Sequence, residues 1–402
     1  MEMKRIIYII AALTAAVSCS LSETGQSHRT DRDDIWKNPA FNADSSSTDR
    51  KRCYITGLDY PDGYDWRADP EKGTVKCSLV VFTDGRPVMK VPVGDEYLVS
   101  PDPDMHRVIR GHLYTDYSTE EETVVKKDGQ EIFRYRGREM ILGMAVSDGD
   151  VYTLGRPRHG DGFAYRRNGE ILIGSSSGHA FPRLQQDGDT LCFAFSKPIE
   201  SVSDTVERYY HVRGGKTSQV AVREDVKKVW DVIWHDGKAC YLATMTGVSS
   251  PVVVNGESMK ALEFSQGIDM LTSSLLSVGK SLGTEAVCTY GFSYSSCLWM
   301  DAVRHRQFAG GMIVNGLCTS GNGICCVLNP GTGGRQGIIF RCGENFDMPV
   351  GYAAMGSSPV AMMDGILHVG LSSLNEGKPA IWKDGKTEEL DINGMICTLS
   401  VD

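Results

Sequence analysis

Residues 144–154 read MAVSDGDVYTL, and residues 163–174 read FAYRRNGEILIG. In each stretch, two short runs of apolar and β-forming residues flank an Asp-Gly or Asn-Gly dipeptide. Such dipeptides are the preferred centres of two-residue hairpins, because both turn positions must adopt φ > 0. The two stretches therefore predict two consecutive hairpins, and so four short strands in succession.

The turn of the second hairpin recurs along the chain. A degenerate copy, LWMDA at residues 298–302, aligns with IWKDG at residues 381–385, so Ala302 stands at a glycine position. The other copies carry their turn glycine at Gly85, Gly129, Gly169, Gly215, Gly256, Gly343 and Gly385. These eight copies are spaced by about 43 residues, which is the period of a repeat architecture.

The turn of the first hairpin recurs with the same period. Its copies lie at Gly149, Gly188, Gly237, Gly279, Gly323 and Gly365, and the PDPD stretch at residues 101–104 supplies an earlier one. Four strands in a unit of about 40–50 residues are the sequence signature of a β-propeller. We therefore expect an all-β chain with almost no helix, since no 3.6-residue periodicity persists.

The number of turns predicts how the ring closes. Eight turns join the third strand (C) to the fourth (D) of a unit, but only seven join the first (A) to the second (B). The first unit begins at a B strand near residues 53–56, and residues 394–401 form a lone A strand. We predict eight four-stranded blades, closed by the C-terminal strand beside the N-terminal blade. Seven blades is the alternative, because the first two units are the least regular.

The N-terminus has the order of a secretory signal. Lys4 and Arg5 precede an apolar run at residues 6–17, which is too short to span a bilayer. The run ends in AVSC at residues 16–19. This motif resembles the lipobox of bacterial lipoproteins, in the looser form of Bacteroidota, because Ala16 replaces the usual leucine. The resemblance implies cleavage before Cys19 and lipidation of Cys19.

Three regions follow from this interpretation. We predict a signal peptide at residues 1–18, a lipidated and disordered tether at 19–52, and the propeller at 53–402. The tether is polar and cannot bury enough surface to offset its ordering entropy. The lipid anchor predicts an outer-membrane lipoprotein, on the periplasmic side or at the cell surface. Ordinary secretion, with Cys19 incidental, is the alternative.

The strand pattern also resembles that of kelch-like propellers, in which a strand ends in glycine, as VYTLG does at residues 151–155. The kelch double glycine is absent, so the resemblance implies architecture only.

Composition and motifs exclude several functions. The net charge of −9 argues against nucleic-acid binding, which requires a basic face. The sequence lacks a Gly-x-Ser-x-Gly nucleophile motif, a P-loop, and Cys-x₂-Cys or His-x₃-His metal spacings. We therefore predict no catalytic residue, metal or cofactor. Most cysteines other than Cys19 are expected to be buried thiols, although Cys53 and Cys77 could pair across one loop.

A candidate site is expected on the face that carries the B–C and D–A connections, because function in a rigid scaffold usually lies on its longer loops. Aromatic residues could stack on sugars, arginines could bind carboxylates, and His/Asp could hydrogen-bond hydroxyls. The candidate ligand-binding residues are Tyr64, Trp66, Arg158, His159, Asp161, His179 and Arg335. The alternatives are a loop folded onto its own blade for Tyr64 and Trp66, and solvated residues for His159 and Asp161.

These observations favour a monomeric, non-catalytic lipoprotein whose loop face binds a glycan or a protein partner. One alternative is a hydrolase or lyase with its active site at the mouth of the propeller channel. Another is a structural subunit of an envelope assembly.

Overall fold

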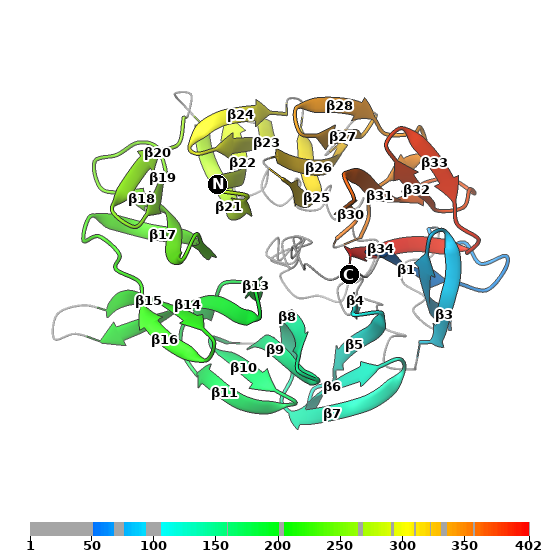
Figure 1. Ribbon diagram of the computed structural model, residues 1–402, viewed down its shortest axis with the longest axis horizontal. Coiled ribbons are helices and arrows are strands. Elements are labelled where there is room, and N and C mark those ends of the chain that lie inside the picture. The colour runs from blue at the N-terminus through cyan, green and yellow to red at the C-terminus, as the bar shows by residue number, and fades with distance from the viewer. Residues whose placement is uncertain are drawn as a thin grey trace, which may run out of the picture.

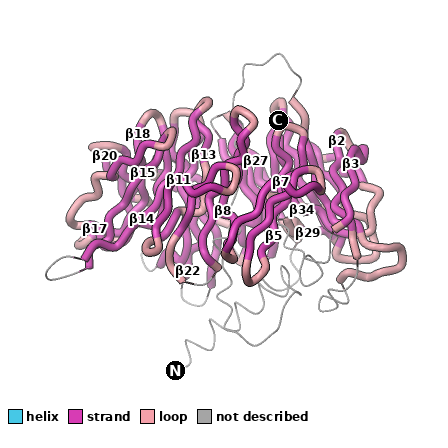
Figure 2. Tube along the Cα trace, turned by 90° about the horizontal axis from the view of Figure 1, so that it is seen from below, coloured by secondary structure: helices cyan, strands magenta, loops and turns pink. Residues whose placement is uncertain are grey.

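The computed structural model describes residues 51–67, 76–93, 106–158, 160–200, 205–263, 268–290, 293–308, 311–321, 323–330, 336–356 and 358–401. The predicted signal peptide, Cys19 and the tether lie outside these residues. So do the candidate site residues His159 and Arg335 and the PDPD stretch. Within the described residues every regular element is a strand (Figure 2), and no helical segment has the length and apolarity needed to cross a membrane.

Eight antiparallel sheets are arranged in a ring around a central axis (Figure 1), which confirms the predicted eight-bladed β-propeller. Blade 1 contains β34 (Gly394–Val401), β1 (Cys53–Asp59), β2 (Ser78–Thr83) and β3 (Arg86–Pro92). Blade 2 contains β4 (His106–Ile109), β5 (His112–Ser118), β6 (Glu122–Lys127) and β7 (Gln130–Arg136). Blade 3 contains β8 (Glu139–Ser147), β9 (Asp150–Pro157), β10 (Phe163–Arg167) and β11 (Glu170–Ser175).

The A strand of blade 4 is divided into β12 (His179–Ala180) and β13 (Gln185–Asp187), and β14 (Thr190–Glu200), β15 (Thr205–Arg213) and β16 (Lys216–Gln219) follow. Blade 5 contains β17 (Val226–His235), β18 (Lys238–Met245), β19 (Val252–Asn255) and β20 (Ser258–Ala261). Blade 6 contains β21 (Ile268–Val278), β22 (Ser281–Tyr290), β23 (Ser293–Met300) and β24 (Val303–Gln307).

Blade 7 contains β25 (Met312–Ser320), β26 (Gly323–Pro330), β27 (Ile338–Arg341) and β28 (Glu344–Asp347). Blade 8 has a second divided A strand, β29 (Tyr352–Ala353) and β30 (Val360–Met363), followed by β31 (Ile366–Ser373), β32 (Ala380–Lys383) and β33 (Lys386–Glu389).

The C–D turns of blades 2, 3, 6 and 8 bind the neighbouring B strand through the side chain of their first residue. Asp128 has a left-handed backbone conformation, with φ 51. Its Oδ1 accepts a hydrogen bond from the Leu113 amide at 2.9 Å. Asn168 accepts in the same way from Val151 at 2.8 Å, and Asp301 from Leu282 at 3.0 Å. Asp and Asn therefore recur at this position for two reasons: they tolerate φ > 0, and they cap the neighbouring B strand.

Two turn predictions are refined by the structure. The degenerate copy does form a turn, with φ 71 at Ala302. The A–B turn of blade 2, however, is formed by Arg110 and Gly111, between β4 and β5, and not by residues 101–104. Arginine at a left-handed position gives no Asp-Gly signal, which is why the sequence pattern missed this turn.

Ring closure follows the predicted scheme. β34 pairs antiparallel with β1, from Cys53 opposite Val401 to Asp59 opposite Gly394. The hydroxyls of Thr56 and Thr398 join the two strands at 2.7 Å. The described chain thus begins and ends on the face of the tight A–B and C–D turns. We call this the turn face, and the opposite face, with the B–C and D–A connections, the loop face.

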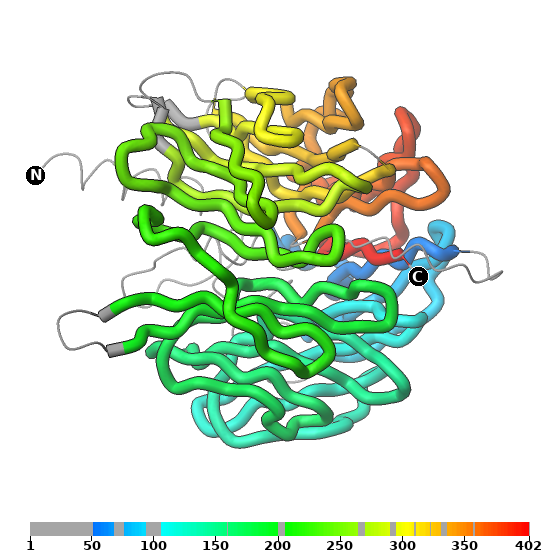
Figure 3. Tube along the Cα trace, turned by 60° about the vertical axis from the view of Figure 1, so that its left-hand side comes forward, coloured from blue at the N-terminus to red at the C-terminus, as the bar shows by residue number. Residues whose placement is uncertain are grey.

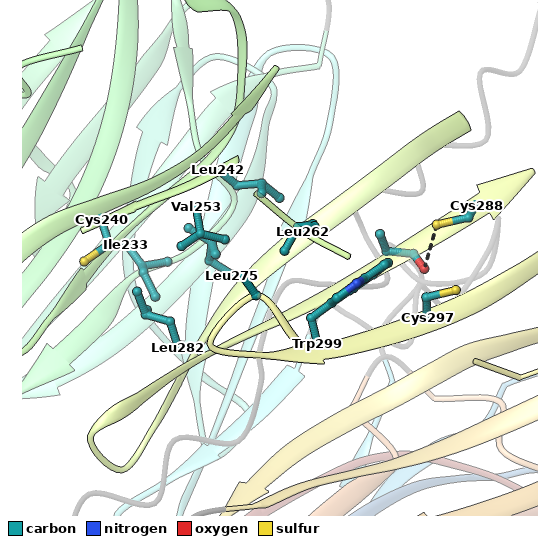
Figure 4. Packing of buried hydrophobic residues seen from close by; sticks show 12 residues of the cluster. Ile233, Cys240, Leu242, Val253, Leu262, Leu275, Leu282, Cys288, Cys297 and Trp299 are labelled. Atoms are coloured by element: carbon teal, nitrogen blue, oxygen red, sulfur yellow. Dashed lines mark hydrogen bonds between the residues drawn. The ribbon is translucent and has the colours of Figure 1, made fainter. Parts of the chain in front are cut away.

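Apolar side chains fill the interfaces between successive blades. Figure 4 shows the interface of blades 5 and 6, where Ile233, Leu242 and Leu275 pack near Trp299. Cys240, Cys288 and Cys297 belong to the same core cluster. Ten of the eleven described cysteines are buried thiols and only Cys342 is exposed, so Cys53 and Cys77 are not joined. Cysteine acts here as a small apolar residue.

One buried ion pair joins three blades. Arg183, between β12 and β13, lies 3.3 Å from Asp231 of β17, and its Nη1 donates to the Leu275 carbonyl of β21 at 2.7 Å. The Asp231 carboxylate accepts from the amides of Val232 and Leu275, both at 2.8 Å. Burial raises the pKa of Asp231, and Arg183 and these amides act in the opposite direction. Blades 4, 5 and 6 therefore share one polar network in an apolar surrounding.

Candidate functional site

The structure places the described candidate residues on the loop face but divides them between two environments. Asp161 follows β9 and His179 opens β12, and Nε2 of His179 lies 3.7 Å from Oδ1 of Asp161. Both side chains are about two-thirds exposed. Arg158 is exposed nearby, and its amide donates to the Arg138 carbonyl at 3.1 Å. These groups can hydrogen-bond a partner from solvent, but exposure leaves a His/Asp pair little strength for proton transfer.

Tyr64 and Trp66 are half-buried and fold onto the propeller. Trp66 packs against the core cluster of blades 1 and 2, and the Arg67 guanidinium covers its ring at 4.8 Å. Arg67 also donates to the carbonyls of Ser373 and Gly377, both at 3.0 Å, in the B–C loop of blade 8. The blade 1 loop that carries Tyr64 and Trp66 therefore stabilises the ring closure. It offers no free aromatic surface on which a sugar could stack.

The charged and sulfur-containing side chains of the described residues form no metal-binding cluster. No group of three or more His, Cys, Asp or Glu side chains among them could hold a metal ion. The buried histidines His106 and His211 have pKa values lowered to about 3 and about 4, chiefly by burial. Both imidazoles are therefore neutral at physiological pH.

The loop face exposes aliphatic side chains that sequence reasoning did not single out. Val350 is 84% exposed in the connection from β28 to β29, and Leu374 is 48% exposed after β31. The Leu374 amide donates to the Gly351 carbonyl at 2.7 Å, so the two loops lie side by side. Further exposed aliphatic residues toward this face are Val206, Val248 and Leu271. Aliphatic side chains are usually expected to be buried, so nothing in the sequence indicated that these residues lie on the surface.

A second feature is a cleft of about 590 Å³ between blades 4 and 5 (Figure 3 views the ring from their side). One wall comes from β15, β16 and the residues that follow, and the other from β17, β18 and the turn after β19. The cleft opens toward the turn face and the outer rim. The residues lining it are His211, Arg213, Lys216, Ser218, Gln219, Val220, Ala221, Trp234, Ala239, Tyr241, Gly256 and Glu257.

The aromatic part of the cleft is preorganised. The His211 imidazole stacks on the Trp234 indole with ring centroids 4.4 Å apart, and the Arg213 guanidinium lies 5.4 Å from the same indole. Asp187 holds Arg213 through contacts of 2.9 and 3.1 Å. Nε1 of Trp234 and Nε2 of His211 are buried and have no hydrogen-bond partner among the residues that the structure describes. Buried polar atoms are usually paired, so one such atom from each wall of the cleft is notable.

Comparisons with known proteins support the architecture and no particular family. No family model matches the sequence, and no curated protein matches it. Among solved structures, the dihydro-heme d1 dehydrogenase NirN in complex with DHE is similar, with a TM-score of 0.50 and 10% identity over 86% of this chain and 74% of that one. The polysaccharide lyase Uly1 gives a TM-score of 0.39 and 12% identity over 87% and 98%. BamB from Moraxella catarrhalis gives 0.43 and 8% over 74% and 86%.

At these identities the likeness concerns the fold alone, because one propeller architecture serves many unrelated functions. The fold and the sites described here define an eight-bladed, strand-closed β-propeller. Its function must be argued from its own surface.

Proposed function

We propose that this protein is a non-catalytic binding module whose loop face holds a protein partner. In this proposal Cys19 is lipidated and anchors the chain to the outer membrane, on its periplasmic side or at the cell surface. The sequence analysis expected either a glycan or a protein as the binding partner, and of these two we propose the protein.

The observation that carries this choice is the pair of neighbouring exposed aliphatic residues, Val350 and Leu374. Clustered apolar side chains with a polar rim are typical of protein interfaces. The polar residues beside them come from the blade 1 loop, where Asp65 and Arg67 are ion-paired at 3.2 Å. A sugar would need exposed aromatic faces, and Trp66 is covered.

The geometry is also suited to an anchored receptor. The described chain enters at Lys51 and Cys53 on the turn face, next to Val401. A tether attached there would join the propeller on the side opposite the loop face. The binding loops would then point away from the membrane, while the ring would supply a rigid scaffold.

The partner is tested with a Val350→Lys/Leu374→Lys double variant, which places two charges in the aliphatic patch. The matched control is Val88→Lys/Val303→Lys, at two exposed aliphatic positions on the outer D strands of blades 1 and 6. Cross-linking in the native envelope, followed by mass spectrometry, should recover one partner with the wild type and the control. We expect the amount of cross-linked partner to be at least about tenfold lower with the loop-face variant than with the wild type. Equal recovery by all three proteins would refute the proposal.

The anchor is tested separately. Mass spectrometry of the mature N-terminus should find a lipid-modified Cys19, and a Cys19→Ala variant should leave the membrane fraction. An unmodified Cys19, or cleavage at another position, would contradict the anchor without affecting the loop-face proposal.

A further inference from the structure

The cleft between blades 4 and 5 lies beside a position at which blade 5 carries a smaller side chain than blades 6 and 8. Two residues before the C–D turn, Trp299 of blade 6 and Trp382 of blade 8 fill the outer part of the interface with the preceding blade. Blade 5 has Val254 at this position. Its aromatic residue is the cross-strand partner Tyr241, on β18, which lies one strand nearer the axis. Tyr241 lines the cleft, whereas Val254 is buried beside it in the core cluster of blades 4 and 5.

The open space is lined by a mixture of hydrogen-bond donors and acceptors around an aromatic floor. Ser218 and Gln219 on β16 are exposed and can both donate and accept. Lys216 and Glu257 are exposed on opposite walls, and neither has an ion-pair partner among the residues that the structure describes. The charge of Arg213 is balanced by Asp187. The free charges thus cancel, which disfavours a strongly charged ligand.

We propose that this cleft binds a short neutral oligosaccharide, of two or three sugar units. Sugar hydroxyls donate and accept alternately, as the exposed groups on the two walls do, and the apolar face of a sugar ring suits the half-buried indole of Trp234. A volume of about 590 Å³ lies within the range of small-ligand sites. Ligand hydroxyls could also supply the partners that the Trp234 and His211 nitrogens lack. This site is separate from the loop-face patch, so either proposal can fail without the other.

The binding probes are maltotriose, cellotriose and triacetylchitotriose, with trigalacturonate as a charged counterpart. Saturation-transfer NMR and calorimetry on the folded protein should detect binding of at least one neutral trisaccharide. Tryptophan fluorescence should change with the same dissociation constant. If no neutral trisaccharide binds, or if trigalacturonate binds more tightly than all three, the proposal is wrong.

Substitution of Val254→Trp adds, beside the cleft residue Tyr241, the large side chain that Trp299 and Trp382 provide in blades 6 and 8. We expect it to weaken trisaccharide binding by at least about tenfold. Val303→Trp, which adds the same side chain at an exposed position of β24, is the matched control and should bind like the wild type. A second variant, Lys216→Ala/Gln219→Ala, changes only exposed side chains, so it reports binding even if Val254→Trp fails to fold. Unchanged affinity in this second variant would overturn the assignment.

Discussion

Replacing Asp231 by alanine would measure how strongly one carboxylate holds blades 4, 5 and 6 together. The Asp231 side chain is 7% exposed and the Arg183 side chain 8%, so the pair is largely removed from water. The substitution leaves the Arg183 guanidinium buried beside the Leu275 carbonyl, without its counter-charge. It also removes the acceptor of two backbone amides, those of Val232 and Leu275.

The expected loss of stability follows from these contacts. Removing one partner of a buried ion pair typically costs about 3–5 kcal/mol, and an amide left without an acceptor costs roughly 1 kcal/mol more. Two amides lose their acceptor, so a total of about 5–7 kcal/mol is expected for Asp231→Ala. For a domain of roughly 350 residues the unfolding entropy is about 0.7 kcal/mol/K, so the Tm should fall by about 7–10 °C.

Urea denaturation followed by tryptophan fluorescence, together with calorimetry, would measure the effect. An Arg183→Met/Asp231→Leu double variant is the control. It removes both charges and should recover part of the loss, because an apolar pair of similar volume often replaces a buried ion pair at little cost. A loss below about 1 kcal/mol for Asp231→Ala would show that the network contributes little and would refute this reasoning.

Three further predictions concern closure, pH and thiol access. Deleting residues 394–402 should reduce stability by roughly 10 kcal/mol and expose an edge of β1, seen as oligomers in sedimentation; an unchanged monomeric Tm would contradict the closure scheme. His106 has a folded pKa of about 3 against 6.5 when unfolded, so stability is full above pH 6.5 and falls as the pH drops toward 3. Between pH 6 and pH 4, the free energy of unfolding should therefore fall less steeply in His106→Gln than in the wild type, by about 1.4 kcal/mol per pH unit. Equal slopes in the two proteins would argue against a buried neutral imidazole. Native maleimide labelling should modify Cys342 quickly and Cys240 and Cys288 only after denaturation; rapid labelling of the latter two would reverse their assignment as core residues.

The sequence predicted the architecture because the turns carry local chemistry. Each Asp-Gly or Asn-Gly turn needs φ > 0 within two residues, so its signal is independent of the rest of the fold. The number of such turns then predicted both the eight blades and the strand that closes them. The exception is Arg110, whose left-handed conformation is stabilised by the surrounding hairpin and gives no residue signal.

The candidate sites were harder to predict because they depend on neighbours that are distant in sequence. Trp66 looked available for a ligand, and only the contacts of Arg67 with blade 8 show that it is covered. The cleft lies beside Val254, which is small where blades 6 and 8 have tryptophan. That comparison needs the strand register, because the blade 5 turn starts at Gly256, one residue later than the repeat alignment suggests. A single sequence does not contain this information.

The pairing of β34 with β1 also has a consequence for how the chain folds. Thr56 and Thr398 are 342 positions apart, so bringing these strands together costs about 5 kcal/mol of chain entropy before any contact is gained. During synthesis, blades 2 to 8 can form in order from local hairpins, but blade 1 has only three strands until β34 has left the ribosome. Closing the ring should thus be the final and slowest step of folding, with the free edge of β1 exposed to aggregation until then.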